Sequence, residues 1–206
     1  MKKRIALFLM LMVALVASAN DDSPNARQAR RIFDKAYNQV FGNQGSSLKY
    51  DVNIVGLYKT CGTIWMKGKK QRFTDERVDT WNDGKTAYMV YRKKKVIEVH
   101  EATSDKKDKY SGKFKFTLDD FSYHIAEDPE GLLITLKQKK HAKGSIKEVK
   151  ALIDRKSLAP IRLRIKVAFV WTTIKVSNFQ TGGISDALFV FPRERYGKDY
   201  KYVDKR

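Results

Sequence analysis

The first regular pattern along the chain is a stripe of apolar side chains between positions 24 and 41, spaced three and four residues apart. The stripe consists of Ala26, Ala29, Phe33, Ala36, Tyr37 and Val40. This spacing is the period of an amphipathic α-helix. Ser23 before Pro24 is typical of the start of a helix, and Gly42 is typical of its end. The pattern therefore predicts one helix from about Pro24 to Phe41.

After Gly45 the apolar period shortens to two residues. Residues 48–54 and 161–167 alternate between apolar side chains and charged or polar ones. Such alternation is typical of antiparallel strands with one face buried and the other in water. Asn82-Asp83-Gly84 predicts a tight hairpin between two β-rich runs, and the basic residues 92–95 predict another turn.

Further short runs with strand-like composition follow along the chain. They lie at 63–67, 72–76, 96–101, 123–127, 132–138, 146–153 and 171–179. We expect about eleven strands in all, most joined by short turns, which favours a barrel or a strongly curled sheet. The Lys-, Asp- and Gly-rich segment Thr103–Asp120 breaks the pattern and predicts a loop with at most a short helix. This segment and the N-terminal helix are candidate lids, because a barrel of more than about eight strands leaves room inside.

The N-terminus has the pattern of an export signal. Three basic residues follow Met1, an apolar run extends from Ile5 to Ala17, and Ala17-Ser18-Ala19 resembles a signal-peptidase site. The apolar run is shorter than the roughly 20 residues that span a bilayer. We therefore predict a cleaved signal peptide at 1–19, a single domain at 20–206 and export to the periplasm.

The chain is strongly basic, with a formal net charge of +19. Such an excess favours an anionic partner: a membrane surface, lipopolysaccharide, an acidic protein or nucleic acid. Export makes nucleic acid the least favoured of these, and aromatic residues that alternate with the charges also weaken that interpretation. A basic docking surface is predicted at Lys69, Lys70, Arg72, Arg92, Lys93 and Lys94. The alternative interpretation is a solvated outer face.

The sequence offers no recognisable catalytic or metal-binding pattern. The histidines at 100, 124 and 141 have no metal-ligand spacing, and Cys61, the single cysteine, excludes an internal disulfide. Neither G-x-S-x-G nor H-E-x-x-H occurs. We therefore predict a protein without catalysis, metal or cofactor, and keep a secreted hydrolase and a polyanion-binding protein as alternatives.

Three groups of residues, in this order, resemble the outer-membrane lipoprotein carrier proteins of the LolA type. The groups are Gly62-x-x-Trp65-x-Lys67 with Phe73, then Trp81-Asn82-Asp83-Gly84-Lys85-Thr86-x-Tyr88, and last Phe189-Val190-Phe191-Pro192 with Tyr202-Val203-Asp204. The resemblance extends over nearly the whole predicted mature chain. It departs at Gly68, where many members of that family carry an arginine that holds the lid.

The resemblance implies a fold and a function. The implied fold class is mainly β with helices (α+β): an incomplete antiparallel β-barrel of about 11 strands, closed by an N-terminal helix and a lid segment. The implied function is a non-catalytic periplasmic carrier that receives lipoproteins from an inner-membrane releasing complex and delivers them to an outer-membrane receptor. A monomer is expected. The alternative is a periplasmic binding protein or sensor for another lipid or amphiphile.

An acyl-chain carrier needs an apolar concave face, because burying each CH₂ group is worth about 0.8 kcal/mol. By the resemblance, Trp65, Phe73, Trp81 and Tyr88 match aromatic positions around the family's cavity. The full set that we predict to line the hydrophobic cavity is Ile54, Trp65, Phe73, Trp81, Tyr88, Ile134, Leu136, Leu163 and Trp171.

Overall fold

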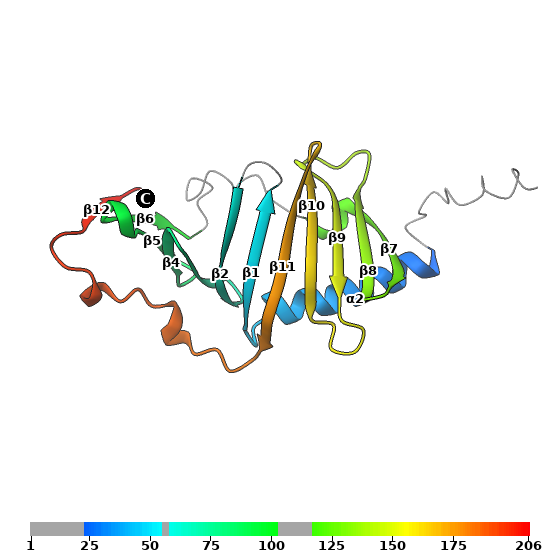
Figure 1. Ribbon diagram of the computed structural model, residues 1–206, viewed down its shortest axis with the longest axis horizontal. Coiled ribbons are helices and arrows are strands. Elements are labelled where there is room, and N and C mark those ends of the chain that lie inside the picture. Colours follow the sequence, from blue (N-terminus) through cyan, green and yellow to red (C-terminus); the bar gives the residue numbers. More distant parts are fainter. Residues whose placement is uncertain (1–22, 55–57, 103–116) are drawn as a thin grey trace, which may run out of the picture.

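The computed structural model describes residues 23–54, 58–102 and 117–206. Within these residues the chain forms one long helix and one curled sheet (Figure 1). The predicted signal peptide at 1–19 and most of the expected lid at 103–120 lie outside them. In this described part of the chain, no helix has both the length and the hydropathy that crossing a bilayer requires.

Helix α2 (Pro24–Phe41) has the bounds that the sequence predicts. The Ser23 hydroxyl accepts a hydrogen bond from the Ala26 N–H at 3.1 Å, which caps the first turn. At the other end, the Gly42 N–H donates to the Asn38 carbonyl at 2.8 Å. The apolar stripe is the buried side of the helix, so its amphipathic spacing is explained by packing.

Twelve strands of the described residues form a single sheet in the order β12-β6-β5-β4-β3-β2-β1-β11-β10-β9-β8-β7. Their bounds are β1 (Ser46–Ile54), β2 (Tyr58–Lys67), β3 (Lys70–Asp75), β4 (Val78–Asn82), β5 (Thr86–Tyr91), β6 (Val96–Glu101), β7 (Phe121–Asp128), β8 (Gly131–Gln138), β9 (Ile146–Ile153), β10 (Pro160–Val167), β11 (Val170–Thr181) and β12 (Lys201–Asp204). Short 3₁₀ helices are η1 (Arg92–Lys94), η3 (Leu118–Asp120), η4 (Asp186–Phe189) and η5 (Arg193–Arg195).

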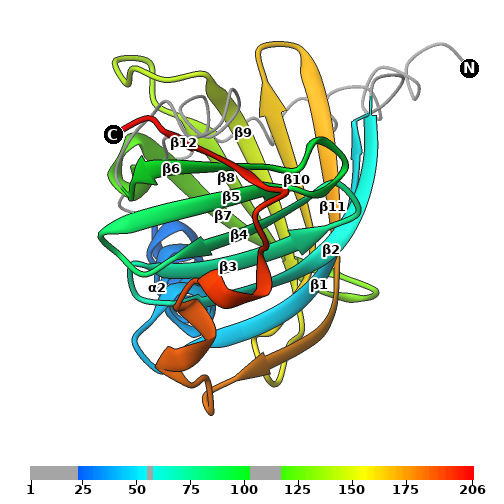
Figure 2. The ribbon, with the colours of Figure 1, turned by 90° about the vertical axis from the view of Figure 1, so that its left-hand side faces the viewer.

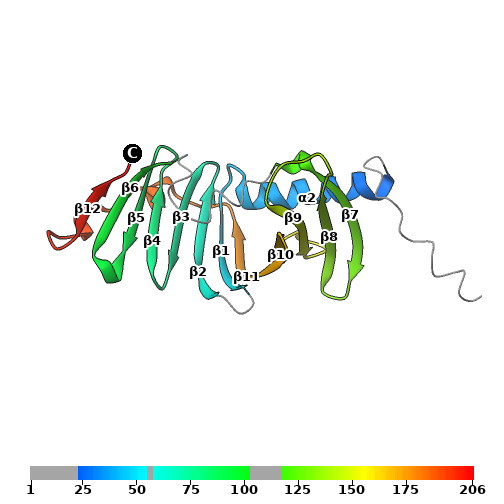
Figure 3. The same cartoon turned by 90° about the horizontal axis from the view of Figure 1, so that it is seen from above.

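The sheet is open, with β12 at one edge and β7 at the other (Figure 3). Neighbouring strands are antiparallel, except that β12 lies parallel to β6. Figure 2 shows the accumulated twist, since β3–β6 run across the direction of β8–β10. The predicted fold class, an incomplete β-barrel with a helix at the N-terminus, is confirmed.

About eleven strands were expected along the chain, and the polar, basic C-terminus at 199–206, with Tyr200, Tyr202 and Val203, was a candidate for a last edge strand. The twelfth strand of the described residues, β12, forms there, at the edge of the sheet. Its partner β6 lies roughly a hundred residues earlier in the sequence, and such a long-range parallel pairing leaves no local signature. The predicted hairpin at Asn82-Asp83-Gly84 is present between β4 and β5. There Gly84 adopts a φ of 95° and the Asn82 side chain accepts its N–H at 2.8 Å.

Helix α2 covers one face of β7–β10, which we call the helix face. Its residues Ala29, Phe33 and Ala36 pack there in the largest core cluster. Strand residues of that cluster include Phe121, Tyr123, Ile125, Ile134, Leu136, Val149, Ala151 and Ile153. At the β7 edge, the Asn25 side chain exchanges two hydrogen bonds with the backbone of Ile125, at 2.9 and 3.0 Å. This pairing occupies backbone groups that an edge strand otherwise leaves open.

The opposite side of the sheet, the outer face, is covered over β3–β5 by the segment that follows β11. Figure 2 shows this segment crossing in front of these strands, with α2 behind them. Phe191 and Tyr196 lie on Trp81, with ring centroids 5.6 and 6.2 Å away. Phe191 also stacks on Tyr88 at 4.2 Å. The C-terminal segment therefore builds a second core on the face that α2 does not touch.

Candidate functional site

An apolar surface remains on the helix face beyond the strands that α2 covers. It consists of half-buried side chains on β11, β1, β2 and β3: Val52, Ile64, Phe73, Ile174 and Val176. We call this surface the apolar patch. Strand pairing unites it, because residues in register share a face: Ile174 pairs with Val52, and Ile64 pairs with Phe73.

The apolar patch lies on a smaller buried cluster of Leu48, Tyr50 and Met66. From α2, Val40 packs against this cluster, close to the end of the helix. The patch therefore continues the apolar surface under α2 into a region where the described helix stops. A contiguous apolar surface left partly open is the usual mark of a binding site for an apolar ligand or partner.

One polar group lies within this apolar region. The Tyr50 hydroxyl is buried and has no hydrogen-bond partner among the described residues. Its ring stacks on Phe73, with centroids 5.5 Å apart and planes 11° from parallel. Burial, and next the negative charge of Asp75, raises the pKa of Tyr50, so the hydroxyl stays neutral. It is therefore a neutral donor and acceptor that lies buried at the base of the apolar patch without a described partner.

The Tyr50 ring fits because β2 has a glycine beneath it. A Cβ added at Gly62 would lie 2.5 Å from the Tyr50 hydroxyl and 2.2 Å from the Thr74 carbonyl oxygen. Near this end of β3, the buried carboxylate of Asp75 accepts hydrogen bonds from the N–H groups of Arg77 and Val78, at 2.7 and 2.8 Å. These hydrogen bonds fix the Asp75 side chain and stabilise the turn that connects β3 to β4.

The structure separates the residues predicted to line one cavity. Phe73 belongs to the apolar patch, and Leu163 packs against the α2 core on the same face. Ile134 and Leu136 are fully buried beneath α2, so the helix already fills the space above them. For Ile54 the structure describes only the backbone, which pairs with Thr172.

Four of the predicted cavity residues lie on the outer face, which corrects the prediction of one shared lining. Trp65 is in register with Arg72, and Arg72 with Trp81, which is in register with Tyr88. Successive side chains of a strand point to opposite faces, and Phe73 points to the helix face. Arg72, and with it the residues in register with it, therefore points to the outer face. Trp171 likewise pairs with Lys166, one residue from the helix-face position Ile165. The sequence shows which side chains of one strand share a face. Which faces of two different strands lie on the same side of the sheet depends on the register of their pairing.

The predicted basic docking surface is partly occupied by contacts within the chain. Arg72 lies between two indole rings, 5.1 Å from Trp65 and 4.9 Å from Trp81. Lys70 forms an ion pair with Asp186 at 3.2 Å, and Arg92 is paired with Asp79. The remaining predicted residues, Lys69, Lys93 and Lys94, are exposed.

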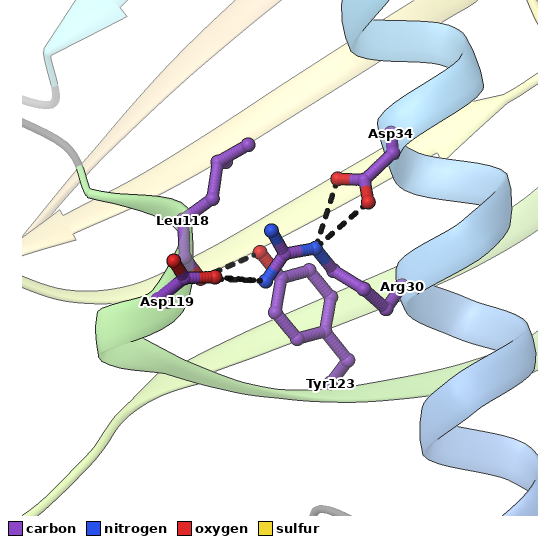
Figure 4. A network of polar contacts seen from close by, with 5 residues as sticks. All are labelled: Arg30, Asp34, Leu118, Asp119 and Tyr123. Carbon is purple, nitrogen blue, oxygen red and sulfur yellow. Dashed lines mark hydrogen bonds and ion pairs between the residues drawn. The ribbon is translucent and has the colours of Figure 1, made fainter.

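A basic groove lies between α2 and β7, with a volume of about 530 Å³. Figure 4 shows the contacts at its wall: the Arg30 guanidinium donates to Asp34 at 2.9 Å and to Asp119 at 2.8 Å. Partial burial pulls the pKa of Arg30 down, but these two hydrogen bonds outweigh it and raise the pKa. The Tyr123 hydroxyl donates to the Leu118 carbonyl at 2.8 Å, so η3 is held against the helix and β7.

Sequence reasoning missed most of the apolar patch. Val52 was recognised as an inward position of an alternating strand, but nothing local linked it to Ile174 or Ile64. Cys61 is an exposed residue of β2. Within the described residues, no cluster of His, Cys, Asp and Glu is arranged to hold a metal ion.

No protein-family model matches this chain, and no curated protein matches it in sequence. Among solved structures, an uncharacterized conserved protein from Thermus thermophilus has a similar fold, with a TM-score of 0.59 and 13% identity over 86% of this chain and 99% of that chain. A putative outer membrane lipoprotein-sorting protein domain from Vibrio parahaemolyticus matches over 80% of this chain and 97% of its own, with a TM-score of 0.44 and 10% identity. A LolA superfamily protein from Nitrosomonas europaea matches over 82% and 99%, with a TM-score of 0.40 and 8% identity. Likeness at these identities concerns the course of the chain and does not extend to function.

Proposed function

We propose that this protein binds acyl chains of lipoproteins on the apolar patch and carries them through the periplasm, from the inner toward the outer membrane. The observation that carries the proposal is the patch itself: apolar side chains of four adjacent strands, half-buried on the face where α2 ends. The sequence resemblance to LolA-type carriers and the export-signal pattern support the same function.

The energetics of acyl chains favour such a surface. An acyl chain of about 15 CH₂ groups costs on the order of 12 kcal/mol to leave in water. A curled sheet shields a chain better than a flat patch does, because the strands on either side rise around it. The exchange itself needs a donor that loads the carrier and an acceptor that binds the chains more favourably. By the resemblance, these are an inner-membrane releasing complex and an outer-membrane receptor.

The Tyr50 hydroxyl gives the apolar patch one point of polar selectivity. Acylated molecules carry ester or amide carbonyls next to their chains, and the buried hydroxyl would gain a hydrogen bond from one once the side chains above it move aside. This group also fits a free lipid, so a binding protein for another amphiphile is the second candidate. The two candidates differ in what accompanies the purified protein: an acylated protein for the carrier, and free lipid alone for the lipid binder.

The decisive experiment combines native purification with a binding assay. Protein isolated from periplasm is extracted with organic solvent, and the bound species are identified by mass spectrometry. In parallel, a fluorescent fatty acid is titrated into delipidated protein. We expect Val52→Thr with Ile174→Thr to weaken binding about tenfold, which corresponds to about 1.4 kcal/mol of lost apolar contact.

The matched control is Leu133→Thr. Leu133 is a half-buried residue of β8 that points away from the helix face, next to the buried Ile134. This variant loses apolar surface of the same kind on the outer face and should bind the fatty acid as the unaltered chain does. Equal fatty-acid binding by all three proteins, or an extract that holds no acylated protein, would remove the proposed function.

A further inference from the structure

The hairpin between β10 and β11 carries the most exposed large apolar side chain of the described residues. Phe169 is 86% exposed at its tip. Val167 and Val170 pair directly, so Ala168 and Phe169 form the whole turn. Ala168 takes a positive φ of 53°, which makes the turn tight. Because so short a turn cannot fold back onto the sheet, Phe169 is held out in solvent.

Cations surround an indole ring directly behind this tip. The Arg164 guanidinium carbon lies 4.8 Å from the centroid of Trp171, and the ammonium groups of Lys150 and Lys166 lie 5.7 and 5.8 Å away. All four side chains are on the outer face, since Trp171 is in register with Lys166. We call Phe169, Trp171, Lys150, Arg164 and Lys166 the tip surface.

A second basic segment lies beside the tip surface. The Ala168 N–H contacts the Ser145 carbonyl at 3.4 Å, which places the β8–β9 loop next to the hairpin. Figure 1 shows both loops at the same end of their strands, at the top of the view. Lys140 and Lys143 of that loop are exposed. One of these cations has an acidic partner: the carboxylate of Glu148, half-buried, lies 3.6 Å from the Lys150 ammonium.

We propose that the tip surface docks on an anionic lipid bilayer, with Phe169 entering the interface. An apolar tip with an amphipathic ring and long basic side chains around it matches the layers of a bilayer surface. The ring of Phe169 would reach the acyl boundary, Trp171 the headgroup level, and the cations the lipid phosphates. A polyanion in solution would be satisfied by the charges alone and gives no reason to hold a phenylalanine in water.

This docking does not depend on the apolar patch, which lies on the other face and on strands β1–β3 and β11. Membrane attachment through the hairpin and acyl-chain binding on the helix face are therefore separate properties. Together they would place the ligand-binding face away from the membrane contact while the molecule is attached. A variant of Phe169 should accordingly leave fatty-acid binding in solution unchanged.

The test is flotation of the full chain with vesicles of phosphatidylethanolamine and phosphatidylglycerol, compared with vesicles of phosphatidylcholine alone. We expect binding only to the anionic vesicles and a decline as salt is added. Phe169→Ser should weaken binding about tenfold, from the apolar contact of one buried ring. Arg164→Gln and Lys166→Gln should each weaken it roughly fivefold.

Matched controls separate the tip surface from bulk charge and exposed apolar area. Phe41→Ser removes a phenylalanine that is 45% exposed at the end of α2. Lys198→Gln with Lys201→Gln removes two exposed cations, one just before β12 and one in it, at a sheet edge that six strands separate from β11. Both controls should bind as the unaltered chain does, and loss of binding in either would overturn the assignment to this hairpin.

A position-specific readout completes the experiment. In Phe169→Trp, brominated lipids should quench more tryptophan emission than in the unaltered chain. Vesicle binding without this extra quenching would overturn the insertion of the tip. If light scattering finds a dimer that Phe169→Ser abolishes, with no vesicle binding, the tip surface contacts a second copy instead. Salt-sensitive binding to heparin that ignores Phe169, again without vesicle binding, would assign the cations to a soluble polyanion and likewise overturn the proposal.

Discussion

Tyr50 and Tyr123 are buried tyrosines of the helix face whose hydroxyls have opposite fates. Tyr123 donates to the Leu118 carbonyl at 2.8 Å, whereas Tyr50 has no partner among the described residues. Burial raises the pKa of both, so neither ionises at neutral pH. The two hydroxyls therefore differ in hydrogen bonding and not in charge. Comparing them measures how much an unpaired buried hydroxyl lowers the free energy of unfolding.

Replacing each by phenylalanine should change stability in opposite directions. Tyr123→Phe should lower the free energy of unfolding by about 1 kcal/mol, because the Leu118 carbonyl loses its shorter hydrogen bond and keeps only the one from Arg30 at 3.3 Å. Tyr50→Phe should raise it by about 1 kcal/mol, because it removes a polar group that is buried without compensation. Urea unfolding followed by circular dichroism measures both. A loss of stability in Tyr50→Phe would mean that the Tyr50 hydroxyl has a partner, such as a bound water molecule.

At the scale of elements, the least protected part of the sheet is the edge formed by β12. This strand has four residues and a single neighbour, β6. A side-chain contact adds to its backbone pairing: the Lys205 ammonium lies 2.7 Å from the Glu98 carboxylate. The other oxygen of that carboxylate is 3.1 Å from the His100 ring. Glu98 thus links β6 to the residues that follow β12.

The attachment of β12 should weaken in acid. Burial alone would raise the pKa of Glu98, but hydrogen bonds from Lys205 and His100 outweigh it and lower the pKa below its usual 4.5. A carboxylate whose pKa is lower in the folded state stabilises it above the unfolded pKa, and this contribution is lost as pH falls through the folded value. Hydrogen exchange of the β12 amides, relative to those of β9, should therefore accelerate below about pH 4.

Glu98→Gln is the control for this effect. The glutamine side chain cannot ionise, so in this variant β12 should be weakly held already at neutral pH. Hydrogen exchange of its β12 amides, relative to those of β9, should not accelerate further in acid. An unaltered chain whose β12 amides follow those of β9 throughout the acid range would contradict the role of Glu98.

At the scale of the whole molecule, the two faces of the sheet carry separate cores. The helix face is filled by α2 over β7–β10 and continues as the apolar patch. The outer face is covered by the C-terminal segment, where Phe191 stacks between Tyr88 at 4.2 Å and Tyr196 at 5.3 Å. Because the sheet lies between them, damage to one core should leave the other surface intact.

Phe191→Ala tests this independence. We expect the free energy of unfolding to fall by about 2 kcal/mol, somewhat less than for a fully buried phenylalanine. The emission of Trp81 should shift to longer wavelength as water reaches its ring. Fatty-acid affinity should stay unchanged, measured below the onset of unfolding. A loss of affinity equal to that of Val52→Thr with Ile174→Thr would show that the two faces are coupled.

The sequence by itself determined the elements of this protein. The stripe from Ala26 to Val40 and the caps at Ser23 and Gly42 specify α2, because helix period and end chemistry are local properties. Alternation over residues 48–54 and 161–167 likewise specifies strands and tells which side chains of each strand share a face. The hairpin at Asn82-Asp83-Gly84 follows from the conformations that those residues allow.

Only the tertiary structure decided which faces of different strands join. Trp81 and Phe73 were expected in one lining, yet pairing of Arg72 with Trp81 puts them on opposite sides of the sheet. The pairing of β1 with β11, more than a hundred residues apart, created the apolar patch, and the parallel pairing of β12 with β6 made β12 an edge strand of the sheet. A shift of one residue in such a register turns every side chain of a strand to the other face, and no local pattern carries that information.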